Sequence, residues 1–389
     1  MWRLTDKPLW IYTPLTLTLK NVDFFLKTCF NISNDAGNVT GNVIEYTNAY
    51  LDEAMQSITI RDVAKKAGVS VSTVSRVLNG KVDVAKGTKR HILKVIDELG
   101  YSTNLAARSM RSNKKNLIGL IMPDIAYPFA IEVMKGVNRA IAESEFNLLV
   151  YTSGDVRKSG HISSEQKYMS LLAKSLSDGV IVVAPVASEY KADKPIVSID
   201  PAMGNPNFPS VHATNYQGSL DAMEYLIGLG HRRIGYISGR SELMSAERRL
   251  SGYRDALKKA GFPIDEELIA SGDYTTKTGI QCGQKLLSLE NPPTAIFASN
   301  DQMAMGVYQI AKEMGLRIPY DFSLIGFDNI PESEHLGLTT VDQFISEMGY
   351  AATQMLIKLI NDVPLEDYTY KMQTRLVIRY SCYEVPGEN

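Results

Sequence analysis

The sequence predicts a protein of two parts, a small all-α helix-turn-helix headpiece followed by a large α/β body built from two doubly wound parallel sheets. Two short helical patterns joined by a tight turn stand within residues 59–79. From residue 117 onward, apolar runs of strand length alternate with amphipathic helical patterns. With 389 residues, of which 44% are hydrophobic and 22% are charged, the chain is long enough for two or three domains with apolar cores.

The headpiece is predicted from the stretch TIRDVAKKAGVSVSTVSRVLN, which begins at Thr59. This threonine and the aspartate three residues later form a capping-box pattern, which predicts a helix over Asp62–Ala67 that a glycine ends. Ser70 can cap a second helix, expected over Val71–Leu78. Two short helices separated by about four residues have the helix-turn-helix format, whose second helix enters the major groove of DNA.

The side chains of the two helices divide by their spacing. The apolar stripe that packs the helices together comprises Val63, Ala64, Ala67, Val74, Val77 and Leu78. The outward-facing residues of the second helix are Val71, Ser72, Ser75 and Arg76. A guanidinium such as that of Arg76 suits the O6 and N7 atoms of guanine, and Val71 suits a thymine methyl group. A packed helix pair with a solvated polar face fits the same spacing, so the spacing alone leaves both interpretations open.

The charge of the chain is unevenly distributed. Residues 57–115 contain thirteen Lys and Arg and four Asp and Glu, a net charge of +9, and because the whole chain carries −2 the remainder carries −11. A protein that contacts DNA phosphates with one end alone needs a basic module at that end, and here such a module is joined to an acidic body.

The motif T-I-x-D-V-A-x-x-A-G-V-S-x-x-T-V-S-R-V-L-N, present in Thr59–Asn79, resembles the DNA-binding signature of the LacI/GalR (lactose-repressor) family of bacterial transcription regulators. The resemblance extends through nearly all of residues 57–382. It implies a regulator, expected to be a repressor, that binds a double-stranded DNA operator and is controlled by a small effector. It also implies a body of periplasmic-binding-protein type.

The resemblance implies a headpiece at 57–103, a hinge helix and linker at 104–116, and an effector-binding and dimerisation domain at 117–389. An N-subdomain is expected at about 117–212 and 343–369, and a C-subdomain at about 213–340 and 370–384. The chain is expected to cross between them near Ala213, Asp328 and about Tyr370. Only seven residues follow Cys382, too few for a C-terminal tetramerisation helix, so we expect a homodimer.

Residues 1–54 do not resemble the family. The run WIYTPLTLTL is interrupted by threonines and Pro14 and is followed by no A-x-A cleavage site, so we do not expect a secretory signal. Met55 stands two residues before the family-like stretch, and we expect it to be the physiological start, with an interaction arm as the alternative. No apolar run reaches the roughly 18 residues of a membrane span.

Thr88 can cap a third helix that runs to about Leu99 and closes the headpiece core. The segment NLAARSM that follows is too short to be a stable helix alone. In the family this position is a hinge helix that folds on the operator and inserts a leucine into the minor groove. Met110 occupies the position of that leucine, Ala107 the position where paired hinges touch, and Thr103 replaces the usual proline. A plain linker is the alternative.

The residues expected to contact DNA are Thr59, Ser70, Val71, Ser72, Thr73, Ser75, Arg76 and Asn79 in the headpiece, and Asn104, Ala107 and Met110 in the hinge.

The body is predicted to contain seven buried parallel strands and six helices. The strands are expected at Leu117–Met122, Phe146–Tyr151, Gly179–Val183, Ile196–Ile199, Ile234–Ser238, Ala295–Ala298 and Ser323–Gly326. The helices are expected near Phe129–Ser144, Gln166–Leu176, Tyr216–Leu229, Ala246–Ala260, Thr278–Leu289 and Asp301–Met314. This many alternating units require two sheets.

Ligands of open α/β sheets bind at the carboxyl ends of the strands, and polar and aromatic residues follow several predicted strands. The residues expected to bind the effector are Tyr127, Phe129, Asp200, Ser245, Arg249, Tyr274, Asn300 and Asp328. The resemblance places six of these on effector-contacting positions of the family, namely Arg249, Asn300, Asp328, Ser245, Tyr274 and Asp200. Arginine and aspartate can bond vicinal hydroxyls while an aromatic ring stacks on the apolar face of a sugar.

A sugar effector is therefore expected, with a purine as the alternative, because purine-responsive relatives use the same arginine and aspartate. Asp301 is expected to cap the helix that follows it. Asp124, which follows the first strand, is either a cleft residue or only a structural cap.

No enzyme is expected. The sequence has no nucleophile–base pair, no phosphate-binding glycine fingerprint and no Cys or His spacing typical of a metal site, so no cofactor is implied. The three cysteines suggest no disulfide framework, which fits the reducing cytoplasm. A solute-binding protein of a transporter would share the body but lack the basic headpiece. A catabolite regulator controlled by a phosphorylated carrier protein is a second alternative.

Overall fold

The computed structural model describes residues 58–78, 84–99, 101, 115–154, 161–187, 189–202 and 206–385. The chain divides into two compact units, residues 1–104 and residues 105–389. Among the described residues, no helix is long and apolar enough to cross a membrane.

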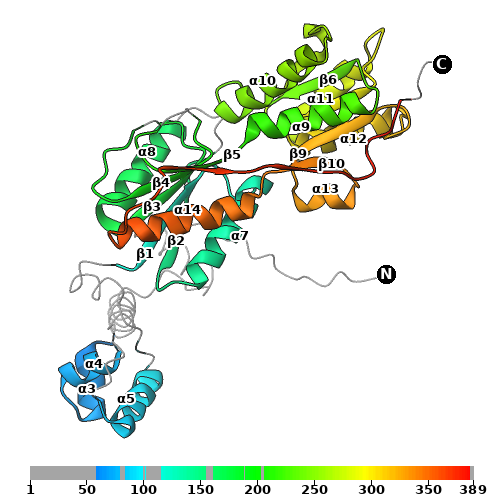
Figure 1. Ribbon diagram of the computed structural model, residues 1–389. Helices are drawn as coiled ribbons and strands as arrows, with labels where there is room; N and C mark the ends of the chain where they lie inside the picture. Colours follow the sequence, from blue (N-terminus) through cyan, green and yellow to red (C-terminus); the bar gives the residue numbers. More distant parts are fainter. Residues whose placement is uncertain are drawn as a thin grey trace, which may run out of the picture. The chain divides into compact units, whose positions relative to one another are not determined.

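The described part of the first unit contains the helices α3 (Ile60–Ala67), α4 (Val71–Leu78) and α5 (Lys86–Leu99) (Figure 1). Because α5 already begins at Lys86, the prediction that Thr88 caps it was wrong, and this threonine lies inside the helix.

The beginning of α3 follows the predicted capping box. The Asp62 carboxylate accepts hydrogen bonds from the backbone N–H (2.8 Å) and the hydroxyl (2.6 Å) of Thr59. The headpiece core consists of Val63, Ala64, Ala67, Val74, Val77, Ile92 and Val95, so all of the predicted apolar stripe except the half-buried Leu78 is fully buried.

The first sheet of the body has the strand order β11-β5-β4-β3-β1-β2. Its strands are β1 (Leu117–Met122), β2 (Asn147–Thr152), β3 (Gly179–Val183), β4 (Ile196–Ile199), β5 (Ser210–Ala213) and β11 (Thr369–Met372). One face packs against α7 (Pro128–Ala142) and α14 (Ile345–Ile360), and the other against α8 (His161–Leu171) and a π-helix (Leu172–Leu176). These elements form the first subdomain (Figure 1).

The second sheet has the order β12-β10-β9-β8-β6-β7. Its strands are β6 (Ile234–Ser238), β7 (Ile269–Ser271), β8 (Ala295–Ala298), β9 (Ser323–Asp328), β10 (Thr339–Asp342) and β12 (Arg375–Val377). One face packs against α9 (Asn215–Gly228) and α10 (Met244–Lys259), and the other against α11 (Thr276–Leu287) and α12 (Asp301–Glu313). A 3-10 helix (Glu266–Leu268) and α13 (Pro331–His335) complete the second subdomain.

All seven predicted strands are present and pair in parallel, which confirms the two doubly wound sheets. Five strands of three or four residues were not predicted, namely β5, β7, β10, β11 and β12, and the last of these pairs antiparallel with β10. The expected crossing near Asp328 was wrong, because β10 still pairs with β9 and the chain leaves the second sheet only after Asp342. The last crossing lies between β11 and β12, beyond Tyr370.

Candidate functional sites

The helix α4 carries the headpiece residues predicted to read DNA. Ser72 and Arg76 are exposed, whereas Val71 and Ser75 are half-buried, and Val71 also packs against the headpiece core. The Ser70 hydroxyl accepts a hydrogen bond from the backbone N–H of Thr73 (3.2 Å) and lies 2.7 Å from the Ser72 hydroxyl. This cap holds the first turn of α4, from which Ser72 projects.

Four predicted DNA contacts, Asn79, Asn104, Ala107 and Met110, lie outside the described residues.

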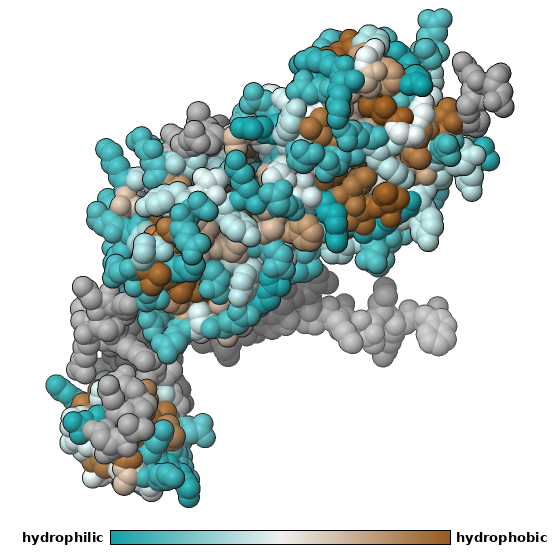
Figure 2. Space-filling model, in the orientation of Figure 1, coloured by the Kyte–Doolittle hydropathy of each residue, from teal (hydrophilic) through white to brown (hydrophobic). Residues whose placement is uncertain are grey.

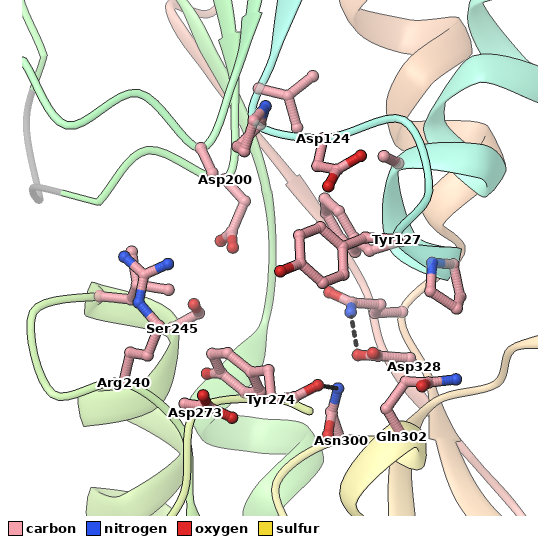
Figure 3. Close-up of a pocket in the computed structure, with 18 of the residues that line it drawn as sticks. Asp124, Tyr127, Asp200, Arg240, Ser245, Asp273, Tyr274, Asn300, Gln302 and Asp328 are labelled. Atoms are coloured by element: carbon pink, nitrogen blue, oxygen red, sulfur yellow. Dashed lines mark hydrogen bonds between the residues drawn. The ribbon is translucent and has the colours of Figure 1, made fainter. Parts of the chain in front are cut away.

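A cavity of about 150 Å³ lies between the two subdomains, and all eight residues predicted to bind the effector line it (Figure 3). The first subdomain contributes Tyr127 and Phe129 at the start of α7 and Asp200 after β4, and the second contributes Ser245 and Arg249 on α10, Tyr274 after β7, Asn300 after β8 and Asp328 at the end of β9. Because carboxyl ends of parallel strands meet at one edge of a sheet, strands far apart in sequence deliver these side chains to one place.

Arg249 is held by several partners and is only 3% exposed. Its guanidinium donates to the Asn215 side chain (2.8 Å) and to the Ser299 carbonyl (2.5 Å), and it lies 3.5 Å from the Asp328 carboxylate. It also stacks on the Phe327 ring, 3.7 Å from the centroid. These contacts compensate for burying the charge and fix the guanidinium in place.

The buried carboxylates resist ionisation. Burial raises the pKa of Asp328 to about 7, although the neighbouring Arg249 and a hydrogen bond from Gln343 (2.6 Å) favour the charged form. Burial also raises the pKa of Asp200, against the lowering influence of Arg249 and of a hydrogen bond with Ser245. Clustered carboxyl groups with raised pKa values in a cavity are typical of functional sites.

Three cavity residues have left-handed backbone conformations. The φ angles are +48° at Asp200, +71° at Tyr274 and +118° at Asp328. Such angles are strained for residues other than glycine and persist where the surrounding structure imposes them. Their occurrence at three strand ends around one cavity supports a binding role for this edge.

Tyr274 lies with its ring against the backbone of Gly239, where a Cβ atom would come within 2.0 Å of the ring. Any other residue at 239 would displace the ring. The Tyr274 hydroxyl is buried and makes no hydrogen bond of normal geometry within the described structure. Burial raises the pKa of Tyr274 to about 12, against the lowering influence of Arg249 and of the nearby Ser245 hydroxyl. It is therefore ready to bond a ligand in the cavity.

The prediction that Asp301 caps α12 was wrong, because Asn300 is the cap. The Asn300 side chain accepts a hydrogen bond from the backbone N–H of Met303 (2.9 Å) and donates to the Tyr274 carbonyl (3.2 Å). The Asp301 carboxylate is instead fully buried, where it accepts from the Thr340 hydroxyl (2.6 Å). Asn300 thus lines the cavity and also holds the Tyr274 backbone.

Asp124 lines the cavity, as one of its two expected roles required. It accepts a hydrogen bond from the backbone N–H of Ala126 (2.9 Å) but does not cap α7, which has no side-chain cap. Four other polar residues line the cavity and were not predicted, namely Arg240, Asp273, Gln302 and Gln343. Their common signal is a position shortly after a strand, but Gln343 follows β10, which was itself not predicted. Among the described residues, no group of His, Cys, Asp or Glu could hold a metal ion.

A helix-turn-helix module joined to a two-subdomain α/β body with a polar cavity between the subdomains defines a ligand-responsive DNA-binding regulator. Comparisons with known proteins agree. Residues 59–104 match the family described as "Bacterial regulatory proteins, lacI family", and residues 223–382 match the "Periplasmic binding protein-like domain".

The relatives that this chain matches over nearly their whole length are transcription regulators rather than enzymes. The chain is 33% identical to catabolite control protein A of Priestia megaterium, over 84% of this chain and 99% of that protein. It is 34% identical to the HTH-type transcriptional repressor PurR of Mannheimia succiniciproducens, with the same coverage, and 33% identical to the repressor CytR of Escherichia coli, over 84% and 97%.

Solved structures agree as well. A complex of the transcriptional regulator CelR with cellobiose matches with a TM-score of 0.63 and 29% identity, over 83% of this chain and 99% of that one. The Lac repressor bound to ONPG in the repressed state matches with a TM-score of 0.76 and 25% identity, over 84% and 100%. The chain therefore belongs to the LacI family of DNA-binding transcription regulators, as the sequence motif predicted.

Proposed function

We propose that this regulator is a cytoplasmic repressor that binds its operator as a homodimer, and that a sugar in the cavity between the subdomains changes its operator affinity. The convergence of all eight predicted effector residues on one cavity carries this proposal. The structure of the CelR relative, which contains cellobiose, supports a sugar in particular.

The chemistry of the cavity also supports a neutral polyhydroxyl ligand. Its lining includes the four carboxyl groups of Asp124, Asp200, Asp273 and Asp328, against two guanidinium groups. Hydroxyl groups can exchange hydrogen bonds with carboxyl groups in either protonation state, whereas a phosphate group would meet four acidic side chains against two guanidinium groups. Tyr127, Phe129 and Tyr274 supply aromatic faces for the apolar side of a ring.

In this proposal Arg76 and Ser72 read base edges in the major groove, and the hinge segment at 104–116 follows the headpiece into the minor groove. Two copies are needed because paired headpieces read a pseudo-palindromic operator. Hydrophobic residues gather on the surface of the second subdomain around α13, which supports contact with a second copy there (Figure 2). Light scattering of the purified protein tests for the dimer.

The test of the effector is a thermal-shift screen of the full chain against mono- and disaccharides, cellobiose included, with sugar phosphates and purines in parallel. A ligand that binds only the folded state stabilises it by about 2.7 kcal/mol at a hundredfold excess over its Kd. We expect a saturable shift with a neutral sugar. A saturable shift with a purine or a sugar phosphate alone would refute the sugar assignment.

A further inference from the structure

Asp178 binds the backbone at the end of the linker and at the start of β1. Its carboxylate is buried, and it accepts hydrogen bonds from the backbone N–H of Lys115 (2.9 Å to each oxygen) and of Leu117 (3.1 Å). In return, the Asp178 backbone N–H donates to the Leu117 carbonyl (2.8 Å). Charge-assisted bonds of this kind are stronger than neutral ones.

Two further contacts hold the same point of the chain. The Lys115 ammonium group donates to the Ser175 carbonyl (2.6 Å) in the π-helix, whose last carbonyls lack intrahelical partners. Asn116 has a φ of +52°, and its carbonyl accepts a hydrogen bond from the Asn147 N–H (2.8 Å) at the start of β2. We call Asp178, Lys115 and Asn116 the linker anchor.

The linker anchor and the cavity lie at opposite ends of the same two strands. β1 begins at Leu117 beside the linker anchor and leads to Asp124 at the cavity, and β3 begins after Asp178 and leads to Ala184 at the cavity. The two strands are neighbours in parallel register. Five to six residues at about 3.3 Å each separate the ends by roughly 17–20 Å. Such short, buried strands move as one body with their sheet.

We propose that Asp178 is a positioning residue for DNA recognition, because it fixes the point at which the DNA-binding linker leaves the first subdomain. A rotation of that subdomain then displaces the linker, whereas a flexible junction would absorb the rotation. This inference rests on the proposed function, since it assumes that the headpiece binds an operator.

The direction of the change in DNA affinity on removing the Asp178 charge distinguishes a positioning role from a purely electrostatic one. Asp178→Asn removes a negative charge, which by itself favours DNA binding. The amide also turns an NH2 group toward backbone N–H donors, which disrupts the linker anchor. Loss of operator binding in this variant therefore cannot come from the charge. Asp193→Asn, which removes the same charge from an exposed site of the same subdomain, is the matched control.

The experiment measures affinity for the duplex that the wild-type protein selects from a random pool, and for a random duplex of equal length. Non-specific affinity comes from headpiece cations, so the ratio of the two affinities isolates specific placement. We expect Asp178→Asn to lower this ratio about tenfold. Lys115→Gln, which removes the bond to the Ser175 carbonyl together with one positive charge, should lower it about threefold. Asp193→Asn should leave it unchanged.

An unchanged ratio in a folded Asp178→Asn protein overturns the inference. Should that variant fail to fold, as melting curves would show, Lys115→Gln decides by the same ratio, with Lys174→Gln, which removes the same charge from an exposed side chain of the π-helix, as its control. A wild-type protein that selects no duplex at all would refute the proposed function, and with it this inference.

Discussion

Replacing Tyr274 with phenylalanine should make the protein more stable and its effector binding weaker. The substitution removes only the hydroxyl, which is buried and makes no hydrogen bond of normal geometry in the described structure, although the Ser245 hydroxyl lies near it. In the free protein this group is desolvated and uncompensated, and a ligand in the cavity would satisfy it. The hydroxyl thus lowers the stability of the free state and strengthens the complex.

The size of both effects follows from the cost of a buried unpaired hydroxyl, about 1–3 kcal/mol. Its removal should raise the free energy of unfolding by up to that amount, and each kcal/mol raises Tm by about 2–4 °C for a domain of this size. The effector affinity should fall about 5- to 150-fold, because the ligand then leaves its own polar group unpaired.

Calorimetric titration with the ligand found in the thermal-shift screen measures the affinity, and thermal unfolding measures the stability. Tyr236→Phe is the matched control, because its hydroxyl is also buried without a hydrogen bond of normal geometry, has the Ser299 hydroxyl as a polar neighbour, and does not line the cavity. It should raise Tm and leave the affinity unchanged. Equal affinity in wild type and Tyr274→Phe would remove this hydroxyl from the binding site.

Further substitutions test the remaining roles. Arg249→Ala should abolish the effector response and lower the free energy of unfolding by about 3–5 kcal/mol in chemical denaturation, because a buried carboxylate loses its guanidinium; a response that persists contradicts the assignment. Arg76→Ala should weaken operator binding by about 1–3 kcal/mol and relax specificity at one base pair, whereas Lys65→Ala should weaken all duplexes alike. Identical losses from both would exclude base reading by Arg76. The pKa of Asp328 rises from 3.8 in the unfolded chain to about 7 in the folded protein, so the folded state binds more protons in that window and the free energy of unfolding falls as pH rises through it. Asp328→Asn should flatten this dependence in pH-dependent denaturation.

The residues of the cavity could be predicted because they follow apolar strands. A run such as Ala295–Ala298 has no polar side chain, so it predicts a buried strand, and the polar residues after it must lie at the carboxyl edge of the sheet. The same logic led to Asp200 and Asp328, which the structure brings to one cavity with Asn300.

The features that could not be predicted depend on contacts between residues that are distant in sequence. β10 reads TTVD and has no apolar run, so neither this strand nor Gln343 after it could be predicted. Asn300 and Asp301 are both good capping residues. The choice between them depends on distant residues, because Gly326 leaves room for the Asp301 carboxylate and the Thr340 hydroxyl bonds it. The linker anchor was missed for the same reason, since Asp178 bonds residues more than 60 positions away.

The three crossings between the subdomains are not equivalent. The first and third are bonded to each other, because the Thr214 hydroxyl accepts from the Thr374 N–H (2.9 Å) and lies 3.0 Å from its hydroxyl. The second crossing carries Gln343, whose side chain donates to Asp328 inside the cavity (2.6 Å). A ligand that engages Asp328 must therefore compete or cooperate with a bond from this crossing. The second crossing leads directly into α14, which packs in the same apolar core as β1 and β3, so this core is the route by which a change at Asp328 could reach the linker anchor.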